Sequence, residues 1–368
     1  MEDLHRRDFS LNAIAISLNP ASRGLLLDPT NGLSDVEHGE IRALTIHSFT
    51  NQPVRLLRAL RLAARMGYKL ESRTQDWFNL AIERKLHDTI SAEDAGDELR
   101  ALAREERPQL TLEAWEEQDL LERVSPLLNK KHPDYDAVHR LIKVRDDLFM
   151  AGYRPRLATP MMLAILGRLK EREAASVLSK AGFRSAEIEA IENFPEKAEA
   201  AAKELTGKKT NAAIDAYNYI EKLPMEQVAY ILAESNKSAA VSKIKAFLHK
   251  WRPIRMALPV VSAELEALGM ARGPQFERVV NEVFAAQLNG RGKTPEERVK
   301  MLRKFSGIKE APKKKEKEKK PGKSAEKQSA EAPASKSAAI SPDRKGGKEK
   351  NAALKKVLTA GKKKKKKK

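Results

Sequence analysis

Cysteine is missing from the 368-residue sequence, and aromatic residues make up only 5% of it. The first absence excludes disulfides, thiolate-bound zinc and a thiol nucleophile, and it suits a reducing compartment. The second argues against an all-β sandwich and favours a helix-rich fold. No apolar run approaches the roughly 20 residues of a membrane span, and residues 1–20 lack the pattern of a signal peptide. We therefore expect a soluble, cytoplasmic protein without a membrane partner.

The formal net charge of +19 is distributed unevenly. Residues 309–368 contain 23 Lys and Arg against 7 Asp and Glu, whereas residues 1–308 contain 47 against 44. The last segment also has no aromatic residue, so it cannot bury enough apolar surface to offset the entropy of ordering. We expect a disordered basic tail that either holds RNA by counterion release or acts as a nonspecific solubilising segment.

Hydropathy patterns divide the remaining chain into a short mixed region and a long helical one. Alternating apolar residues predict strands within 12–18, 24–28 and 40–46, with a turn at 28–32. From residue 51 onward the periodicity is helical almost throughout. Helices are predicted over 53–66, 73–84, 92–106, 109–121, 133–150, 158–166, 170–181, 185–191, 195–205, 209–221, 224–234, 236–249, 260–268 and 273–288.

The most specific string is HRRDFSLNA at residues 5–13. Adjacent charges before a strand are poor core material, because charged side chains are rarely buried unless paired. An arginine fork at Arg6 and Arg7 can hold phosphate oxygens or a base edge, and the Asp8 carboxylate can accept hydrogen bonds from ribose hydroxyls. An arginine–aspartate ion pair that fixes the start of the strand explains the same residues. The residue types alone leave both interpretations open.

Four arginines lie on one face of the predicted helix 53–66, within about 120° of arc at 100° per residue. They are Arg55, Arg58, Arg61 and Arg65. Such a face suits contact with phosphates or a base, although a solvated charged face has the same pattern. The histidines are scattered without a metal-ligand spacing, and neither GxxxxGK[ST] nor GxGxxG occurs, so no metal site and no phosphate-binding glycine loop are expected.

Five strings together resemble a known family. RRDFSLNA at 6–13 is similar to the RRDFTxNA motif of bacterial, class II tRNA nucleotidyltransferases and poly(A) polymerases. LDPTNGLSD at 27–35, EIR at 40–42 and PVRLLRALRLAAR at 53–65 resemble the segments that follow it, in family order and spacing. GMARGP at 269–274 resembles the turn before the family's last helix.

This resemblance implies a mostly α fold: the remnant of an α/β nucleotidyltransferase head, followed by helical neck, body and tail domains and a disordered Lys-rich C-terminus. The implied domains are the C-terminal part of the head at 1–48, an RNA- and nucleotide-binding neck at 49–130, an RNA-binding body and tail at 131–306, and the basic tail at 307–368.

The resemblance also implies roles for residues at matching positions. Asp8 would contact the ribose of the incoming nucleotide and Arg55 would read its base. The full set of implied nucleotide-binding residues is Arg6, Arg7, Asp8, Asn12, Asn51, Gln52, Arg55 and Arg58. A flexible segment would contain Asp28, Gly32 and Asp35. RNA would be bound by Arg61, Arg65, Arg272 and, in the Lys-rich tail, Lys313, Lys314 and Lys315.

The sequence departs from the family at two points. The family's DxD carboxylates, which hold the Mg²⁺ ions of the reaction, lie upstream of the RRD string, and Asp3 and Asp8 reproduce neither their spacing nor their setting. We therefore expect a chain truncated at its N-terminus, without catalytic residues or metal ligands of its own and inactive alone. In the base-reading EDxxR motif, Asn51 and Gln52 replace the acidic pair before Arg55. This suggests an A-adding or otherwise specialised member.

Three functional interpretations follow. The first is an enzyme that transfers AMP or CMP from ATP or CTP to an RNA 3′ end, by tRNA maturation or polyadenylation, with Mg²⁺ bound through the missing segment. The second is an inactive remnant that binds tRNA or other structured RNA. The third is a subunit of a split enzyme, completed by a separate head-domain polypeptide. A homo-oligomer is left open.

Overall fold

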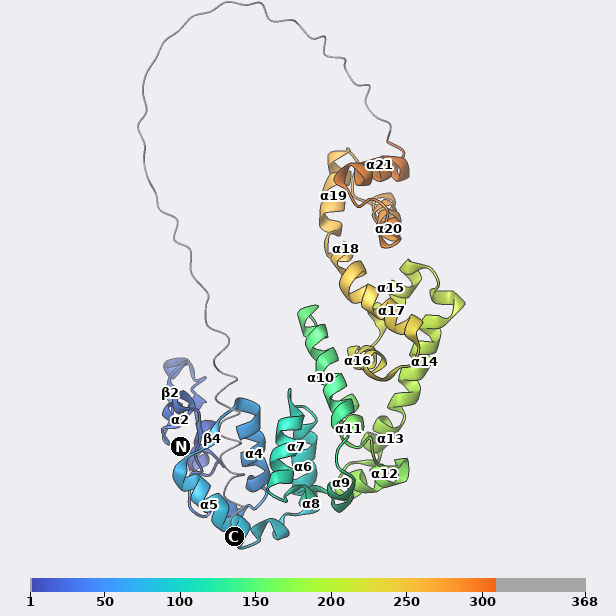
Figure 1. Ribbon diagram of the computed structural model, residues 1–368. Coiled ribbons are helices and arrows are strands. Elements are labelled where there is room, and N and C mark those ends of the chain that lie inside the picture. Colours follow the sequence, from blue (N-terminus) through green and yellow to red (C-terminus); the bar gives the residue numbers. More distant parts are fainter. Residues whose placement is uncertain (1, 309–368) are drawn as a thin grey trace, which may run out of the picture. The chain divides into compact units, whose positions relative to one another are not determined.

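The computed structural model describes residues 2–308 (Figure 1). The predicted basic tail, apart from residues 307 and 308, lies outside the described residues, and so do Lys313, Lys314 and Lys315. Within residues 2–308, no helix has both the length and the apolar character to cross a bilayer.

Short elements form the first part of the chain. Strand β1 (Ala15–Ile16) pairs antiparallel with β2 (Leu26–Leu27), and β3 (Glu40–Ile41) pairs in parallel with β4 (Lys69–Leu70). The helical elements around them are α1 (Glu2–His5), η1 (Ser10–Asn12), η2 (Pro20–Ser22) and α2 (Gly32–His38).

The first three strands lie within the predicted ranges, but each is only two residues long. Residues 10–12 form a 3₁₀ turn because the Ala13 N–H donates to the Ser10 carbonyl at 2.9 Å, so the chain becomes extended only at Ala15. The predicted turn at 28–32 continues into helix α2, which the sequence pattern missed. Asp28 starts this helix by accepting hydrogen bonds from the backbone N–H groups of Gly32 and Leu33.

The rest of the described chain is helical, as predicted. Its helices are α3 (Ser48–Asn51), α4 (Arg55–Met66), α5 (Ser72–Glu83), η3 (Leu86–Thr89), α6 (Ala92–Leu102), α7 (Pro108–Glu117), α8 (Leu121–Val124), α9 (Pro126–Lys131), α10 (Tyr135–Met150), α11 (Ala158–Ile165), α12 (Glu171–Lys180), α13 (Ser185–Glu192), α14 (Phe194–Thr206), η4 (Lys208–Thr210), α15 (Ala213–Lys222), α16 (Met225–Glu234), α17 (Ser238–Ala246), the π turn η5 (Phe247–Trp251), α18 (Arg252–Met256), α19 (Leu258–Ala267), α20 (Pro274–Leu288) and α21 (Pro295–Ser306).

Local sequence signals begin many of these helices. Proline occupies the first turn of α7, α9, α14 and α18 to α21, where a missing N–H costs no hydrogen bond. Side-chain caps start others: Ser91 accepts from the Asp94 N–H, and Asp134 accepts from the Ala137 N–H. Helix α21 lay outside the predicted set, although Thr294 caps it by accepting from the Glu297 N–H.

Two clusters of buried apolar side chains form the core. The first extends in sequence from Phe9 to Ile191, and the second from Leu148 to Leu302. Phe9 belongs to the predicted head, yet it is fully buried in the same cluster as α4 and α7. The predicted boundaries at 48 and 130 stay predictions, since the first cluster extends across both of them.

Two buried aromatic side chains join helices in the core. Trp115 on α7 is fully buried, and its indole N–H donates to the carbonyl of Leu57 on α4 at 3.0 Å. Tyr217 on α15 is also buried, between the rings of Phe247 and Phe284 at centroid distances of 5.1 Å. The Trp115 bond satisfies a buried donor while its ring packs, so it fixes α7 against α4.

Helix α6 packs closely against the end of α12 at Gly96. A Cβ atom built on Gly96 would lie 1.9 Å from the carbonyl oxygen of Ala181. No contact that short is tolerated, so the two helices can approach this closely only because residue 96 has no side chain.

Gly96→Ala is therefore expected to destabilise the protein by about 1–3 kcal/mol, as overpacking does, despite the higher helix propensity of alanine. Urea unfolding followed by circular dichroism measures the change. Asp97→Ala, which removes an exposed side chain from the same helix, is the control and should stay within about 0.5 kcal/mol of the parent. Equal stability of Gly96→Ala and the parent would show that α6 and α12 separate freely.

Candidate functional site

Asp8 lies at the junction between the N-terminal segment and helix α4. It is 8% exposed, and its carboxylate accepts three hydrogen bonds, from the Phe9 N–H at 2.8 Å, Asn12 Nδ2 at 2.9 Å and Arg58 Nη1 at 2.9 Å. Burial alone raises the pKa of Asp8, but the bonds from Asn12, Arg58 and Phe9 outweigh it and hold this pKa below its usual range. Asp8 is therefore ionised and fixed in orientation at neutral pH.

A chain of alternating charges continues from Arg58 along α4. Arg58 Nε donates to Glu98 Oε1 at 2.7 Å, and Arg61 Nε donates to Glu98 Oε2 at 2.8 Å. Arg61 Nη1 then donates to Glu105 Oε1 at 2.7 Å, while Arg65 Nε lies 3.7 Å from Glu105 Oε2. Glu98 is 2% exposed, so its charge is compensated almost entirely by the two arginines.

The arginine face of α4 thus points toward carboxylates of the α6 segment. Burial lowers the pKa of Arg58 and of Arg61, but the attraction of Glu98 more than reverses this and raises both pKa values. Arg61 is buried, whereas Arg65 is mostly exposed. The predicted RNA contacts of Arg61 and Arg65 stay predictions, and for Arg61 an RNA ligand would have to share a guanidinium that two carboxylates already bind.

Arg55 is the exception on this face. It is 9% exposed, and its Nε has no hydrogen-bond partner among residues 2–308. The hydrogen bond of its side chain is a 3.5 Å contact from Nη2 to the Arg6 carbonyl. Burial, and secondarily repulsion by Arg58, lowers the pKa of Arg55 despite the attraction of Asp8. A buried cation without a paired carboxylate is costly, and it is a candidate for contact with an anionic or carbonyl-bearing ligand.

Asn51 and Gln52 lie just before α4 and are both exposed. The Gln52 carbonyl accepts from the Arg55 N–H at 3.0 Å, so the short α3 leads directly into the turn that starts α4. Their amide groups can donate and accept at once. The predicted base-reading residues Asn51, Gln52 and Arg55 therefore lie together at the N-terminal end of α4.

The other predicted arginines lie on the surface in ion pairs. Arg6 and Arg7 follow α1, and each binds a carboxylate four residues earlier, Arg7 at 2.6 Å. Arg272, in the turn before α20, also binds a carboxylate. Their partners are Glu2, Asp3 and Glu266. The two arginines of the predicted fork therefore bind Glu2 and Asp3, whereas Asn12 binds Asp8 directly.

The predicted flexible segment is tied to the strand region by several bonds. Asp35 is buried and accepts from Ser10 Oγ at 2.5 Å and Arg42 Nε at 2.8 Å. A Cβ atom on Gly32 would lie 2.2 Å from the Ser10 carbonyl oxygen, so only glycine allows this contact. With Asp28 capping α2, any movement of the segment would break these contacts, and its flexibility stays a prediction.

Sequence reasoning did not identify Glu98 and Glu105. They are seven residues apart, two helical turns, and they meet arginines spaced by three and four residues on α4. Only the complementary charge spacing of two helices could have indicated them, and that signal requires knowing that α4 and α6 are neighbours.

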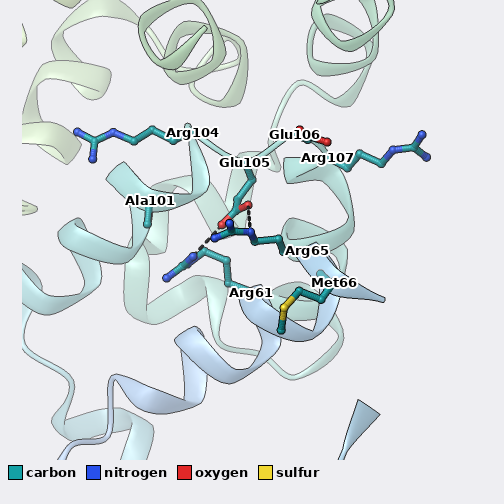
Figure 2. Close-up of a pocket in the computed structure, with 9 residues that line it drawn as sticks. Arg61, Arg65, Met66, Ala101, Arg104, Glu105, Glu106 and Arg107 are labelled. Carbon is teal, nitrogen blue, oxygen red and sulfur yellow. Dashed lines mark hydrogen bonds and ion pairs between the residues drawn. The ribbon is translucent and has the colours of Figure 1, made fainter. Parts of the chain in front are cut away.

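A cavity of about 650 Å³ lies at the far end of this charge chain. Figure 2 shows Glu105 bonded to Arg61 and Arg65, with Arg104 and Arg107 directed away to either side. This cavity is lined mainly by charged side chains.

The described residues do not fit Mg²⁺. No group of three or more His, Asp or Glu side chains in residues 2–308 is arranged to hold a metal ion. The buried carboxylates Asp8, Asp35 and Glu98 each bind arginine, which occupies the oxygens that the ion would need.

Comparison with known proteins bears on the family resemblance. A family model described as the poly A polymerase head domain matches residues 1–42. An A-adding tRNA nucleotidyltransferase of Geobacter sulfurreducens is 22% identical over 312 residues, 81% of this chain and 34% of that protein. The corresponding enzyme of Halalkalibacterium halodurans is 28% identical over 308 residues, 83% of this chain and 68% of that protein. The chain therefore spans about a third of the first relative's length.

A solved tRNA-processing enzyme (apo form I) is 26% identical, with a TM-score of 0.46, and the match covers 78% of this chain and 73% of that one. The likeness to the tRNA nucleotidyltransferase and poly(A) polymerase family, predicted from the motifs, is confirmed by the head-domain match and the two enzymes.

Removing Glu98 should leave Arg58 and Arg61 partly uncompensated inside the protein. Glu98→Ala is expected to lower the free energy of unfolding by about 3–5 kcal/mol, as for other broken buried ion pairs. Urea unfolding measures this loss of stability. The control is Glu266→Ala, which breaks an exposed ion pair with Arg272 and should lower the free energy of unfolding by only about 0–1 kcal/mol. A loss from Glu98→Ala no larger than the control's would mean that water replaces the carboxylate.

The lowered pKa of Asp8 predicts acid sensitivity. Its ionised form stabilises the fold above the ordinary aspartate pKa of about 3.9, and this stabilisation is lost as pH falls toward the lower folded pKa. Asp8→Asn is expected to reduce stability at neutral pH and to flatten the decline below about pH 4. Thermal unfolding across pH, with Asp97→Asn as an exposed control, tests this. An unchanged acid profile in Asp8→Asn would contradict it.

Proposed function

We propose that this chain is part of an RNA nucleotidyltransferase, which adds AMP and/or CMP from a nucleoside triphosphate to RNA 3′ ends, and that tRNA is its RNA substrate. Residues 2–308 would select the nucleotide and bind the RNA. The observation that carries the proposal is Arg55, a buried cation without a carboxylate partner among residues 2–308. It follows two exposed amides in the chain and lies on the same helix face as Arg58, which binds Asp8. The tRNA enzymes among its relatives support the choice of substrate.

Each side chain at this point has a distinct task in the proposal. Arg55 offers guanidinium N–H groups to acceptors on the base or phosphates, where charge-assisted bonds are strongest. Asp8 has accepted three hydrogen bonds, and a carboxylate has about four acceptor positions, so one remains for a ribose hydroxyl. Arg58 and Asn12 hold that carboxylate in place. A deoxynucleotide would lose this bond if the 2′-hydroxyl makes it.

Addition of A is favoured over the full CCA sequence. The relatives that match 76–83% of this chain are named A-adding enzymes. Multifunctional CCA proteins match 38–45% of it, and a CCA-adding enzyme of Lactiplantibacillus plantarum matches 20%, at 40% identity. Asn51 and Gln52 replace the acidic pair expected in enzymes that choose both C and A. We place the protein in the cytoplasm, where the absence of cysteine raises no difficulty.

Nucleotidyl transfer needs metal-bound carboxylates, and residues 2–308 present none in a suitable cluster. The proposal therefore includes two alternatives. In one, the chain binds RNA without catalysis. In the other, it shares catalysis with a polypeptide that carries those carboxylates. The 368-residue polypeptide alone is expected to bind ATP and tRNA without extending the RNA.

Nucleotide binding by this polypeptide tests the proposal. Arg55→Ala is expected to weaken ATP binding about 10- to 150-fold, because a charge-assisted contact of about 1.5–3 kcal/mol is lost. Isothermal titration calorimetry measures the affinity, and labelled ATP and CTP incorporation into tRNA measures transfer. Arg172→Ala on α12, an exposed arginine, is the control.

Failure of the unaltered polypeptide to bind either ATP or tRNA would reject the proposal. An Arg55→Ala variant that folds, as judged by circular dichroism, yet binds ATP like the parent would place the nucleotide elsewhere. Incorporation of label by the polypeptide alone would contradict the expected lack of transfer.

A further inference from the structure

A second cavity, of about 880 Å³, adjoins the one at the end of the charge chain. The two share residues 104–107, the segment between α6 and α7, and the second is lined in addition by the end of α10 and the loop that follows it. Its volume is within the range of ligand-binding clefts, about 300–1,000 Å³. We call the two cavities together the arginine groove.

The arginine groove is lined by seven arginines and four acidic residues, without lysine or histidine. Two of the four carboxylates are already occupied: Glu105 by Arg61 and Arg65, and Asp146 by Arg145 at 2.8 Å. The remaining arginines have no carboxylate within ion-pair distance among residues 2–308. They are Arg104, Arg107, Arg154 and Arg156, and all four are exposed. Among the described residues, the groove therefore carries a surplus of guanidinium groups without carboxylate partners.

An aromatic ring lies among these arginines. Phe149, in the last turn of α10, is 54% exposed, and the Arg154 guanidinium lies 5.1 Å from the centre of its ring. A large apolar side chain in a charged groove gains nothing from burial while it is open to water. Its flat face can instead stack on a nucleobase, and the neighbouring guanidinium can stack or bind a phosphate.

We propose that the arginine groove binds an unpaired segment of RNA, with phosphates on Arg104, Arg107, Arg154 and Arg156 and a base stacked on Phe149. This rests on the proposed function, because it takes RNA as the ligand. It adds a binding site on the α6–α7 segment and α10, separate from the residues around Asp8.

The residue types favour RNA over an acidic polypeptide. Guanidinium groups form two parallel bonds to a phosphate and also stack on planar bases, which ammonium groups cannot do. Carboxylate side chains of an acidic peptide would find partners in the arginines but nothing to stack on Phe149. An aromatic platform between cations is instead the arrangement typical of single-stranded nucleic-acid sites.

The test is binding of a short fluorescein-labelled oligoadenylate to the full chain, followed by anisotropy over a series of salt concentrations. The double variant Arg154→Ala/Arg156→Ala is expected to reduce the slope of log affinity against log salt by about 1.4, since each single-strand phosphate contact contributes about 0.7. Phe149→Ala is expected to weaken binding about 5- to 150-fold, and Phe149→Trp to retain it.

Matched controls isolate the groove. Arg172→Ala/Lys180→Ala removes two exposed cations from α12, and Met150→Ala removes an exposed apolar side chain, 85% accessible, next to Phe149. Both should keep the parent's affinity and slope. The Lys-rich tail is the same in every variant, so differences between variants come from the substitutions.

Three outcomes would overturn the inference. In the first, the parent binds the oligonucleotide and the groove variants bind it with the same affinity and salt slope. That result would reject the groove as the RNA site but leave the proposed function intact. Poly-glutamate could compete as well as RNA, with Phe149→Ala having no effect, which would make the groove a site for acidic chains. Absence of RNA binding by the parent would reject the proposed function as well.

Discussion

The carboxylate of Glu98 is the interaction on which the arrangement of this site depends. It is almost completely buried and binds Arg58 and Arg61 through its two oxygens. Without it, helix α4 would place two cations in the protein interior, and charges of the same sign would face each other one turn apart. With it, the polar face of α4 packs against α6, and Arg58 keeps another N–H group for Asp8. One side chain of α6 thus determines the orientation of a carboxylate ninety residues earlier in the chain.

Arg55 belongs to the same face of α4 but not to the same network. Every other arginine on that face has a carboxylate partner, and Arg55 has a single long bond to a backbone carbonyl. The contrast separates two kinds of buried charge. Arg58 and Arg61 stabilise the contact between α4 and α6, whereas the Arg55 side chain is buried without a carboxylate partner among residues 2–308. A buried charge that destabilises the fold and has no ion-pair partner within the protein is a good candidate for ligand binding.

The charge chain also connects the two regions to which binding is assigned. It starts at Asp8, beside Arg55, and ends at Glu105, whose neighbours line the arginine groove. Because Glu105 satisfies Arg61 and Arg65, it leaves the four outer arginines as the free cations of the groove. The same alternation of charge therefore neutralises the buried contact between α4 and the α6 segment and leaves positive charge at the surface, where a polyanion can reach it.

The sequence by itself determined the order of elements, most helix boundaries and the family likeness. Proline at first turns and side-chain caps are local signals, so helices such as α10 and α20 begin within two residues of their predicted starts. It also indicated Asp8, Asn12, Arg55 and Arg58, which the structure brings to one place. The strands were predicted too long, because their pairing depends on neighbours that no local pattern encodes. Only the tertiary structure decided which arginines of α4 are paired and which is not. That choice depends on Glu98 and Glu105, which become partners of α4 only when α6 packs beside it.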